Sequence, residues 1–129
     1  MEYIKKSVRI TIILLCSILI TACNSSAQDE KEEYLLLEGS KFDQRLAEEK
    51  NPQLIDVRTP EEFSNGTMMK AVNYNVLDNS FNSKIEYLDT NKTVYVFCQR
   101  GGRSAKAVEI LKKNGFNSII ELKGGMDAW

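Results

Sequence analysis

Short runs of apolar residues alternate with amphipathic segments from Tyr34 onward. The apolar runs predict five strands, over 34–37, 53–57, 71–74, 93–97 and 117–122. We interpret the first as an edge strand or a docking segment. The run over 93–97 shows no polar alternation, which is typical of a strand buried on both faces.

The segments between these strands predict four helices, over 40–50, 60–64, 80–88 and 104–114. Ser40 can cap the first helix. Thr59, Pro60 and Glu62 have the spacing of a capping box with proline at the first helical position. The helix over 104–114 lies between two strands and predicts a right-handed crossover between parallel neighbours. We therefore expect a small α/β layer fold with a mainly parallel sheet flanked by helices.

The N-terminal segment has the pattern of a secretion signal. Three basic residues precede an apolar run that continues to Ile20. As a helix, the 14 residues from Ile10 to Cys23 are about 21 Å long, too short for a hydrocarbon core of about 30 Å. The segment ends in Ile20-Thr-Ala-Cys23, which resembles the bacterial lipobox. We expect a lipoprotein signal peptide over 1–22 and lipid on Cys23; the alternative is a plain signal cleaved near Ala22.

Residues 24–33 are almost entirely polar or charged and cannot bury enough surface to fold. We therefore expect a lipidated cysteine and a disordered tether over 23–33, and one folded domain over 34–129. The expected location is the bacterial cell envelope, with the domain anchored by lipid on the periplasmic or outer-surface side. The choice between inner and outer membrane stays open.

Composition restricts the chemistry. The chain has 129 residues, three cysteines and no histidine, so mechanisms that pair Cys or Ser with His are excluded, as are zinc sites that contain His. Removal of the signal takes Cys16 and changes the net charge from −1 to −3, which does not favour nucleic-acid binding. Lipid on Cys23 leaves Cys98 as the only free thiol and allows no internal disulfide. We expect no metal and no cofactor.

Cys98 directly follows the strand over 93–97. It therefore lies at the carboxyl end of a strand, which is where ligands bind in open α/β sheets. Two adjacent glycines in the following loop can turn backbone N–H groups inward, and the next helix adds its N-terminal dipole. Arg100 and Arg103 add positive charge, so this loop should lower the pKa of the thiol. The alternative is an inert buried cysteine, which would have no need of a cationic loop rich in donors.

The stretch Cys98-Gln-Arg-Gly-Gly-Arg-Ser104 resembles the active loop of rhodanese-type sulfurtransferases, Cys-x-x-Gly-x-Arg. Residues 54–63 and 115–129 are similar to two further motifs of that family, so the resemblance covers about 35–129. It implies a rhodanese-like domain in a single-domain lipoprotein form. The loop that would bind substrate and persulfide consists of Gln99, Arg100, Gly101, Gly102, Arg103 and Ser104.

The resemblance also implies a reaction. Cys98 would take a sulfane sulfur from a donor such as thiosulfate, hold it as a persulfide, and pass it to cyanide or to a thiol, including a protein thiol. Asp56 and Arg58 match paired charges of the family and are interpreted as a structural ion pair near the site. Gln99 is expected to face solvent. The family continues into a C-terminal helix, which leaves truncation after Trp129 open.

Two other functions remain as alternatives. Related folds include phosphatases and arsenate reductases with a catalytic cysteine, but those phosphatases place five residues between Cys and Arg, whereas four separate Cys98 from Arg103. Some rhodanese-like domains are non-catalytic binding modules, and the presence of Cys98 argues against that role. The physiological donor and acceptor and the oligomeric state stay open.

Overall fold

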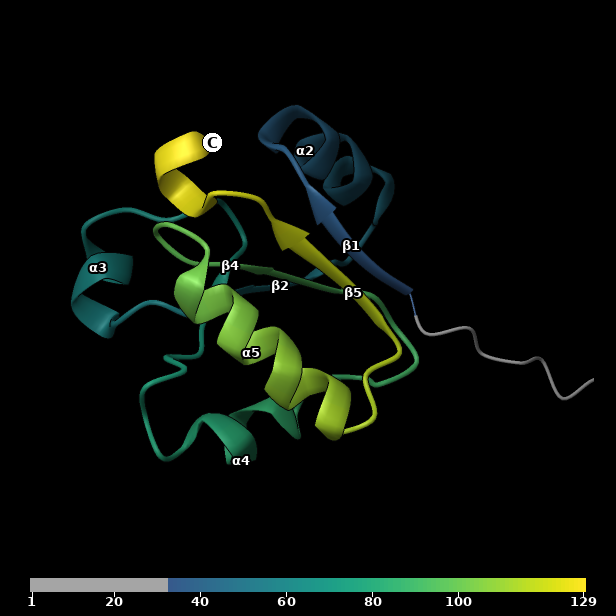
Figure 1. Ribbon diagram of the computed structural model, residues 1–129, viewed down its shortest axis with the longest axis vertical. Helices are drawn as coiled ribbons and strands as arrows, with labels where there is room; N and C mark the ends of the chain where they lie inside the picture. The colour runs from purple at the N-terminus through teal and green to yellow at the C-terminus, as the bar shows by residue number, and fades with distance from the viewer. Residues whose placement is uncertain (1–32) are drawn as a thin grey trace, which may run out of the picture.

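The computed structural model describes residues 33–129. The expected signal peptide over 1–22, the lipidated Cys23 and the tether up to residue 32 lie outside the described residues. The elements, in chain order, are β1 (Glu33–Leu37), α2 (Gly39–Glu48), β2 (Gln53–Asp56), α3 (Pro60–Ser64), β3 (Val72–Asn73), α4 (Phe81–Ile85), β4 (Val94–Phe97), α5 (Gly102–Lys113), β5 (Ser118–Leu122) and the 3-10 helix η1 (Gly125–Ala128), as Figure 1 shows. Glu33, assigned above to the tether, is the first residue of β1.

The five strands form one sheet in the order β1-β5-β4-β2-β3, and every pairing is parallel. The predicted α/β class is confirmed. The strand that precedes Cys98, β4, is central and buried along its whole length. Its carboxyl end lies beside that of β2, so the loops that follow these two strands meet at one edge of the sheet.

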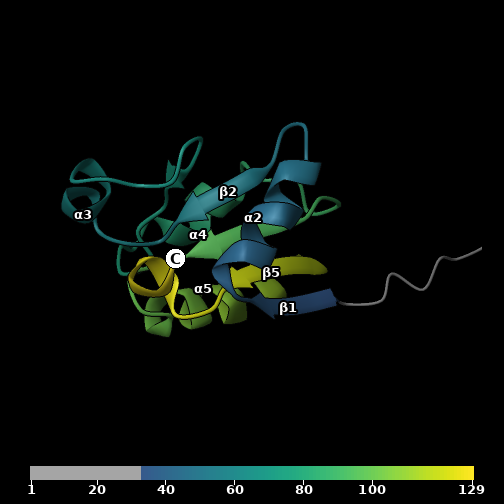
Figure 2. The ribbon, with the colours of Figure 1, turned by 90° about the horizontal axis from the view of Figure 1, so that it is seen from above.

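Helices cover both faces of the sheet (Figure 2). On one face, residues of α4 and α5 pack against inward side chains of β2, β4 and β5. On the other face, Phe42 of α2 packs on Tyr95, with the two rings edge to face at 5.7 Å between centroids. Cys98 belongs to the core on the α5 face, and this places the thiol beneath the first turn of α5.

Local signals place each helix, and the differences lie at helix ends: α2 ends at Glu48 instead of residue 50, and α4 covers Phe81–Ile85 instead of 80–88. The capping box of α3 is confirmed: Thr59 Oγ1 accepts the Glu62 N–H, and Glu62 Oε2 accepts the Thr59 N–H. Ser40, expected to cap α2, lies inside it, because the chain is already helical at Gly39 and Glu38 is the N-cap. Helix α5 begins at Gly102 rather than Ser104.

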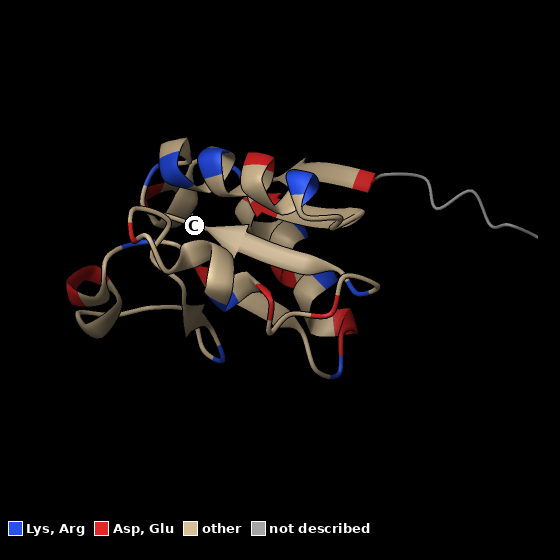
Figure 3. Cartoon of the chain, turned by 90° about the horizontal axis from the view of Figure 1, so that it is seen from below, with Lys and Arg blue, Asp and Glu red and all other residues tan. Residues whose placement is uncertain are grey.

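Within residues 33–129, no helix has the length and apolar composition needed to cross a membrane. The view in Figure 3 shows acidic and basic residues interspersed along helices and loops.

Candidate active site

Cys98 directly follows β4 and forms the floor of a cavity at the carboxyl edge of the sheet. The cavity has a volume of about 430 Å³ and is lined by Glu62, Cys98, Gln99, Arg100, Gly102 and Arg103. Only 1% of the cysteine is exposed. The sulfur is therefore reached through the cavity and is shielded on its other sides by the core.

Polar groups of the loop and of α5 contact the sulfur. The Gly101 N–H donates to Cys98 Sγ at 3.0 Å, and the Ser104 hydroxyl oxygen lies 3.5 Å from it. Burial raises the pKa of the thiol, but hydrogen bonds from the Ser104 side chain and from the backbone N–H groups of Ser104, Gly101 and Arg100 outweigh it and lower the pKa below its ordinary value. The loop thus favours a thiolate in a chain that has no histidine.

The two adjacent glycines have different roles. Gly101 has a φ of +101°, in the region that side chains rarely adopt, and it is the N-cap of α5. Gly102 is the first residue of α5, and an added Cβ there would meet no atom within 4 Å. The turn that points an N–H at the sulfur therefore depends on Gly101, whereas the sequence interpretation assigned it to both glycines.

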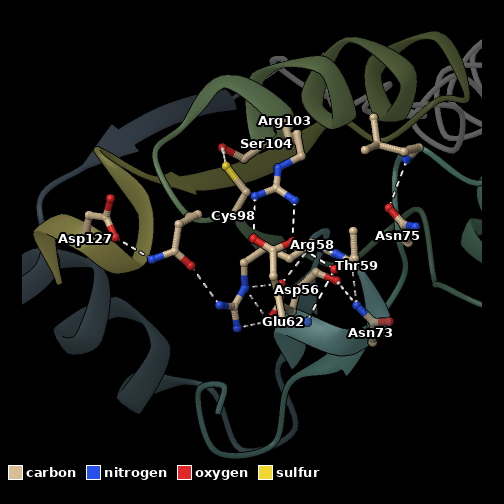
Figure 4. A network of polar contacts seen from close by, with 12 residues as sticks. Asp56, Arg58, Thr59, Glu62, Asn73, Asn75, Cys98, Arg103, Ser104 and Asp127 are labelled. Carbon is tan, nitrogen blue, oxygen red and sulfur yellow. Dashed lines mark hydrogen bonds and ion pairs between the residues drawn. The ribbon is translucent and has the colours of Figure 1, made fainter. Parts of the chain in front are cut away.

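Both loop arginines are paired with carboxylates. Arg103 donates to both carboxylate oxygens of Glu62, at 2.5 and 2.8 Å (Figure 4). The hydrogen bonds from Arg103, together with those from Thr59, lower the pKa of Glu62 to about 2. Arg100 contacts Asp127 at 3.1 Å. The positive charge expected from the sequence is present, but a carboxylate neutralises each guanidinium.

The predicted ion pair between Asp56 and Arg58 lies beside the loop. Asp56 is fully buried and Arg58 is 4% exposed, and the guanidinium contacts the carboxylate at 2.8 Å. Arg58 Nη1 also donates to Gln99 Oε1 at 2.9 Å, and Nη2 donates to the Gly66 carbonyl at 2.6 Å. The pair thereby ties β2 to the active loop.

The expectation that Gln99 faces solvent is wrong. Its side-chain oxygen accepts from Arg58, and its side-chain nitrogen donates to Asp127 (Figure 4). Both partners are far from Gln99 in the sequence, so local spacing contained no signal for this bridge. Gln99 joins the buried ion pair to the closing turn of the chain.

The 3-10 helix η1 holds the back of the loop. The Met126 N–H donates to the Cys98 carbonyl at 2.9 Å, and the Asp127 N–H donates to the Gln99 carbonyl at 3.0 Å. A Cβ on Gly125, whose φ is +64°, would lie 2.4 Å from the Cys98 carbonyl oxygen. This close approach explains why glycine occupies that position of the closing motif.

A buried carboxylate behind the sulfur was not predicted. Glu121 of β5 is 2% exposed, and its Oε1 accepts a hydrogen bond from Ser104 Oγ, which is itself fully buried. The signal available in the sequence was a single acidic residue between apolar residues of the strand over 117–122. Across residues 33–129, no group of three or more His, Cys, Asp or Glu side chains could hold a metal ion.

Comparisons with known proteins agree with this architecture. The model of a family described as "Rhodanese-like domain" matches residues 38–129. The chain is 40% identical over 77 residues to the uncharacterized protein YqhL of Bacillus subtilis (strain 168), which covers 60% of this chain and 60% of YqhL. It is 31% identical over 85 residues to the thiosulfate sulfurtransferase GlpE of Shewanella oneidensis, covering 66% of this chain and 82% of GlpE.

Among solved structures, a rhodanese-like domain protein from Staphylococcus aureus superposes with a TM-score of 0.64 at 31% identity, over 75% of this chain and 90% of that chain.

Proposed function

The chain belongs to the rhodanese-like domain family, and we propose on that basis that it is a sulfurtransferase which carries sulfane sulfur on Cys98. One observation carries the proposal: the Cys98 sulfur lies at the floor of an open cavity with the Gly101 N–H 3.0 Å away. An N–H fixed at that distance stabilises an anionic sulfur without a base. The likeness to a protein named as a thiosulfate sulfurtransferase supports thiosulfate as a donor.

The proposed reaction has two halves. The Cys98 thiolate attacks the outer sulfur of thiosulfate, a sulfur–sulfur bond forms, and sulfite leaves with the electron pair of the broken bond. The product is a Cys98 persulfide anion, which the loop N–H groups can hold. Cyanide or a thiolate then attacks the outer sulfur, and the Cys98 thiolate leaves and is regenerated. The cycle is ping-pong, because the donor product departs before the acceptor reacts.

The test is an intact mass measurement on the purified chain. After incubation with thiosulfate the chain should gain the mass of one sulfur atom, and it should lose that mass when cyanide or a thiol is added. The Cys98→Ser variant should do neither. Absence of sulfur uptake by the wild-type chain, together with hydrolysis of an aryl phosphate through Cys98, would support a phosphatase; neither activity would support a binding module.

We also propose that the domain is anchored to a membrane of the bacterial envelope by lipid on Cys23. The basic segment, the apolar run that is too short to span, and the sequence Ile20-Thr-Ala-Cys23 support this proposal. Fractionation of cells that express Cys23→Ala is the test. Release of the variant from the membrane fraction is expected, and normal processing with retention in the membrane would contradict lipidation.

A further inference from the structure

Three side chains form a line into the core behind the nucleophile. Ser104 Oγ lies 3.5 Å from Cys98 Sγ and 2.5 Å from Glu121 Oε1. Val96 of β4 is the register partner of Glu121 on β5, so these two side chains lie on the same face of the sheet. Cys98 follows Val96 by two positions, and its side chain therefore lies on this α5 face as well. Ser104, in the first turn of α5, lies between the Cys98 and Glu121 side chains.

Glu121 is buried and accepts two hydrogen bonds. It is 2% exposed, and its Oε1 accepts the hydrogen bond from Ser104 Oγ. Its other oxygen accepts a hydrogen bond from the Tyr34 hydroxyl at 2.6 Å. Burial removes a carboxylate from water, and hydrogen bonds from the protein replace part of that hydration.

The hydrogen bonds of this line have a direction. The Cys98 thiol donates to Ser104 Oγ, and the Ser104 hydroxyl is placed to donate to Glu121. The same hydroxyl lies 2.9 Å from the Gly101 carbonyl, which is a second acceptor for its single hydrogen. The thiol hydrogen can move to Ser104 Oγ while the Ser104 hydroxyl hydrogen moves to Glu121 Oε1, with no change in the positions of the sulfur and oxygen atoms. After this transfer, the Ser104 hydroxyl donates to the Cys98 sulfur, and the Glu121 carboxylic acid donates to Ser104 Oγ.

We propose that Glu121, acting through Ser104, is a positioning residue that holds the proton of Cys98 while the sulfur is anionic; this rests on the proposed sulfur transfer. The S–H bond breaks as a bond forms to Ser104 Oγ, and the Ser104 O–H bond breaks as a bond forms to Glu121 Oε1. A neutral thiol and a carboxylate become a thiolate and a carboxylic acid. The net charge of the pair stays at −1, so two anions never face each other across the serine.

Other titratable groups lie near Glu121. Tyr34 of β1 faces the carboxylate, and burial, followed by the hydrogen bond and charge of Glu121, raises the pKa of its phenol to about 12. Glu109 of α5 adds to that rise, and Lys112 of α5 lies 4.6 Å from the centroid of the Tyr34 ring. Tyr34 therefore remains a donor at neutral pH, and the shared proton belongs to Cys98 and Glu121.

Sharing of one proton has a distinct pH signature. Between the two titration steps of the pair, the fraction of thiolate depends on how the proton divides between sulfur and carboxylate, so it does not change with pH. Only at acidic pH, where the pair takes up a second proton, does the thiolate disappear. A cysteine that titrates alone instead gains thiolate by about tenfold per pH unit below its pKa.

The experiment measures the rate of alkylation of Cys98 by iodoacetamide from about pH 4 to about pH 9. The full chain is used with Cys16→Ser and Cys23→Ser, so that Cys98 is its sole thiol. We expect the alkylation rate of the chain with Glu121 to reach a plateau through neutral pH. Glu121→Gln keeps the size of the side chain but removes its charge and one acceptor, and we expect its alkylation rate to rise with pH as for a single titrating thiol. Identical profiles in the two chains would overturn the proposal.

Two further variants complete the test. Ser104→Ala removes the bridge and keeps Glu121, so it should also abolish the plateau; a plateau retained in the folded variant would overturn the proposal even if Glu121→Gln failed to fold. Tyr34→Phe removes a donor to the carboxylate and should raise the plateau by up to about tenfold. A plateau that does not rise would contradict assignment of the proton to Glu121.

Alkylation requires neither a sulfur donor nor an acceptor, so this result is independent of whether sulfur transfer is observed.

Discussion

The floor and the rim of the cavity stabilise charge in different ways. At the floor, the Cys98 sulfur contacts the N–H of the half-buried Gly101 and the hydroxyl of the buried Ser104, which carry only partial charges. At the rim, Arg103 and Arg100 carry full charges, but each is paired with a carboxylate. The comparison indicates that fixed dipoles at the floor hold an anionic sulfur, whereas the arginines chiefly hold the loop in place.

The two ion pairs of the rim also differ from each other. The side chains of Arg103 and Glu62 are 27% and 32% exposed, and their contact is bidentate. Arg100 and Asp127 are 86% and 48% exposed, so solvent screens that pair strongly. Arg103 therefore connects α3 to the loop as a structural contact, while Arg100 remains accessible to a ligand.

The largest effect is expected at the floor, from Gly101→Ala. A side chain at a φ of +101° costs about 1–2 kcal/mol or forces the turn to change, which moves the N–H away from the sulfur. We expect the rate of sulfur uptake from thiosulfate to fall by about tenfold or more. Single-turnover mass measurements would show it.

Gly102→Ala is the matched control, because the added Cβ meets no atom within 4 Å and the residue is already helical. Its rate should stay close to that of the wild-type chain. Equal losses of the sulfur-uptake rate in Gly101→Ala and Gly102→Ala would contradict the distinction between the two glycines. They would also contradict the importance of the Gly101 N–H at the floor of the cavity.

A smaller effect is expected at the rim, from Arg103→Lys. Lysine keeps the charge but cannot contact both oxygens of Glu62, so stability should fall by about 1 kcal/mol at neutral pH. Because the pair lowers the pKa of Glu62 to about 2, its contribution is complete above the ordinary carboxyl pKa of 4.5 and is lost as the pH falls toward 2.

The measurement is the thermal midpoint of both chains from neutral to acidic pH. The gap between them should be constant above about pH 5 and should narrow below it. A gap that does not depend on pH would mean that Arg103 acts through packing and not through Glu62.

The smallest effect is expected from Arg100→Ala. The side chain is 86% exposed, and its backbone N–H, which acts on the sulfur, is retained. The thermal midpoint should not change measurably, and the effect on sulfur uptake should be smaller than that of Gly101→Ala. A larger effect, seen as a raised KM for thiosulfate with unchanged kcat, would show that the rim binds the donor anion and would reverse the comparison.

Local patterns predicted the fold and the position of Cys98. The capping box at Thr59 and the apolar run over 94–97 are properties of neighbouring residues, and both lie where expected. Parallel pairing followed from a helix between two buried strands. These features depend on periodicity and spacing, which a single sequence contains.

The contacts that define the site depend instead on distant residues. Arg103 and Glu62 are 41 positions apart, as are Arg58 and Gln99. No spacing rule connects such pairs, so the loop arginines were expected to offer free charge and Gln99 was expected to face solvent. Prediction of the contact between Glu121 and the site requires the strand order, because β5 lies beside β4 and places the carboxylate on the same face of the sheet as Cys98.

Pairing of β1 with β5 has a consequence for the newly synthesised chain. Tyr34 and Glu121 are 87 positions apart, and β5 separates β1 from β4 in the sheet. While the ribosome is still making residues 118–127, the earlier strands have no partner on that side, and such non-local pairing forms late. Cys98 in a nascent chain lacks Glu121 and the turn at Met126, so it has the reactivity of an ordinary thiol. Under the proposed function, we expect reactivity toward sulfur donors only after β5 and η1 have been synthesised.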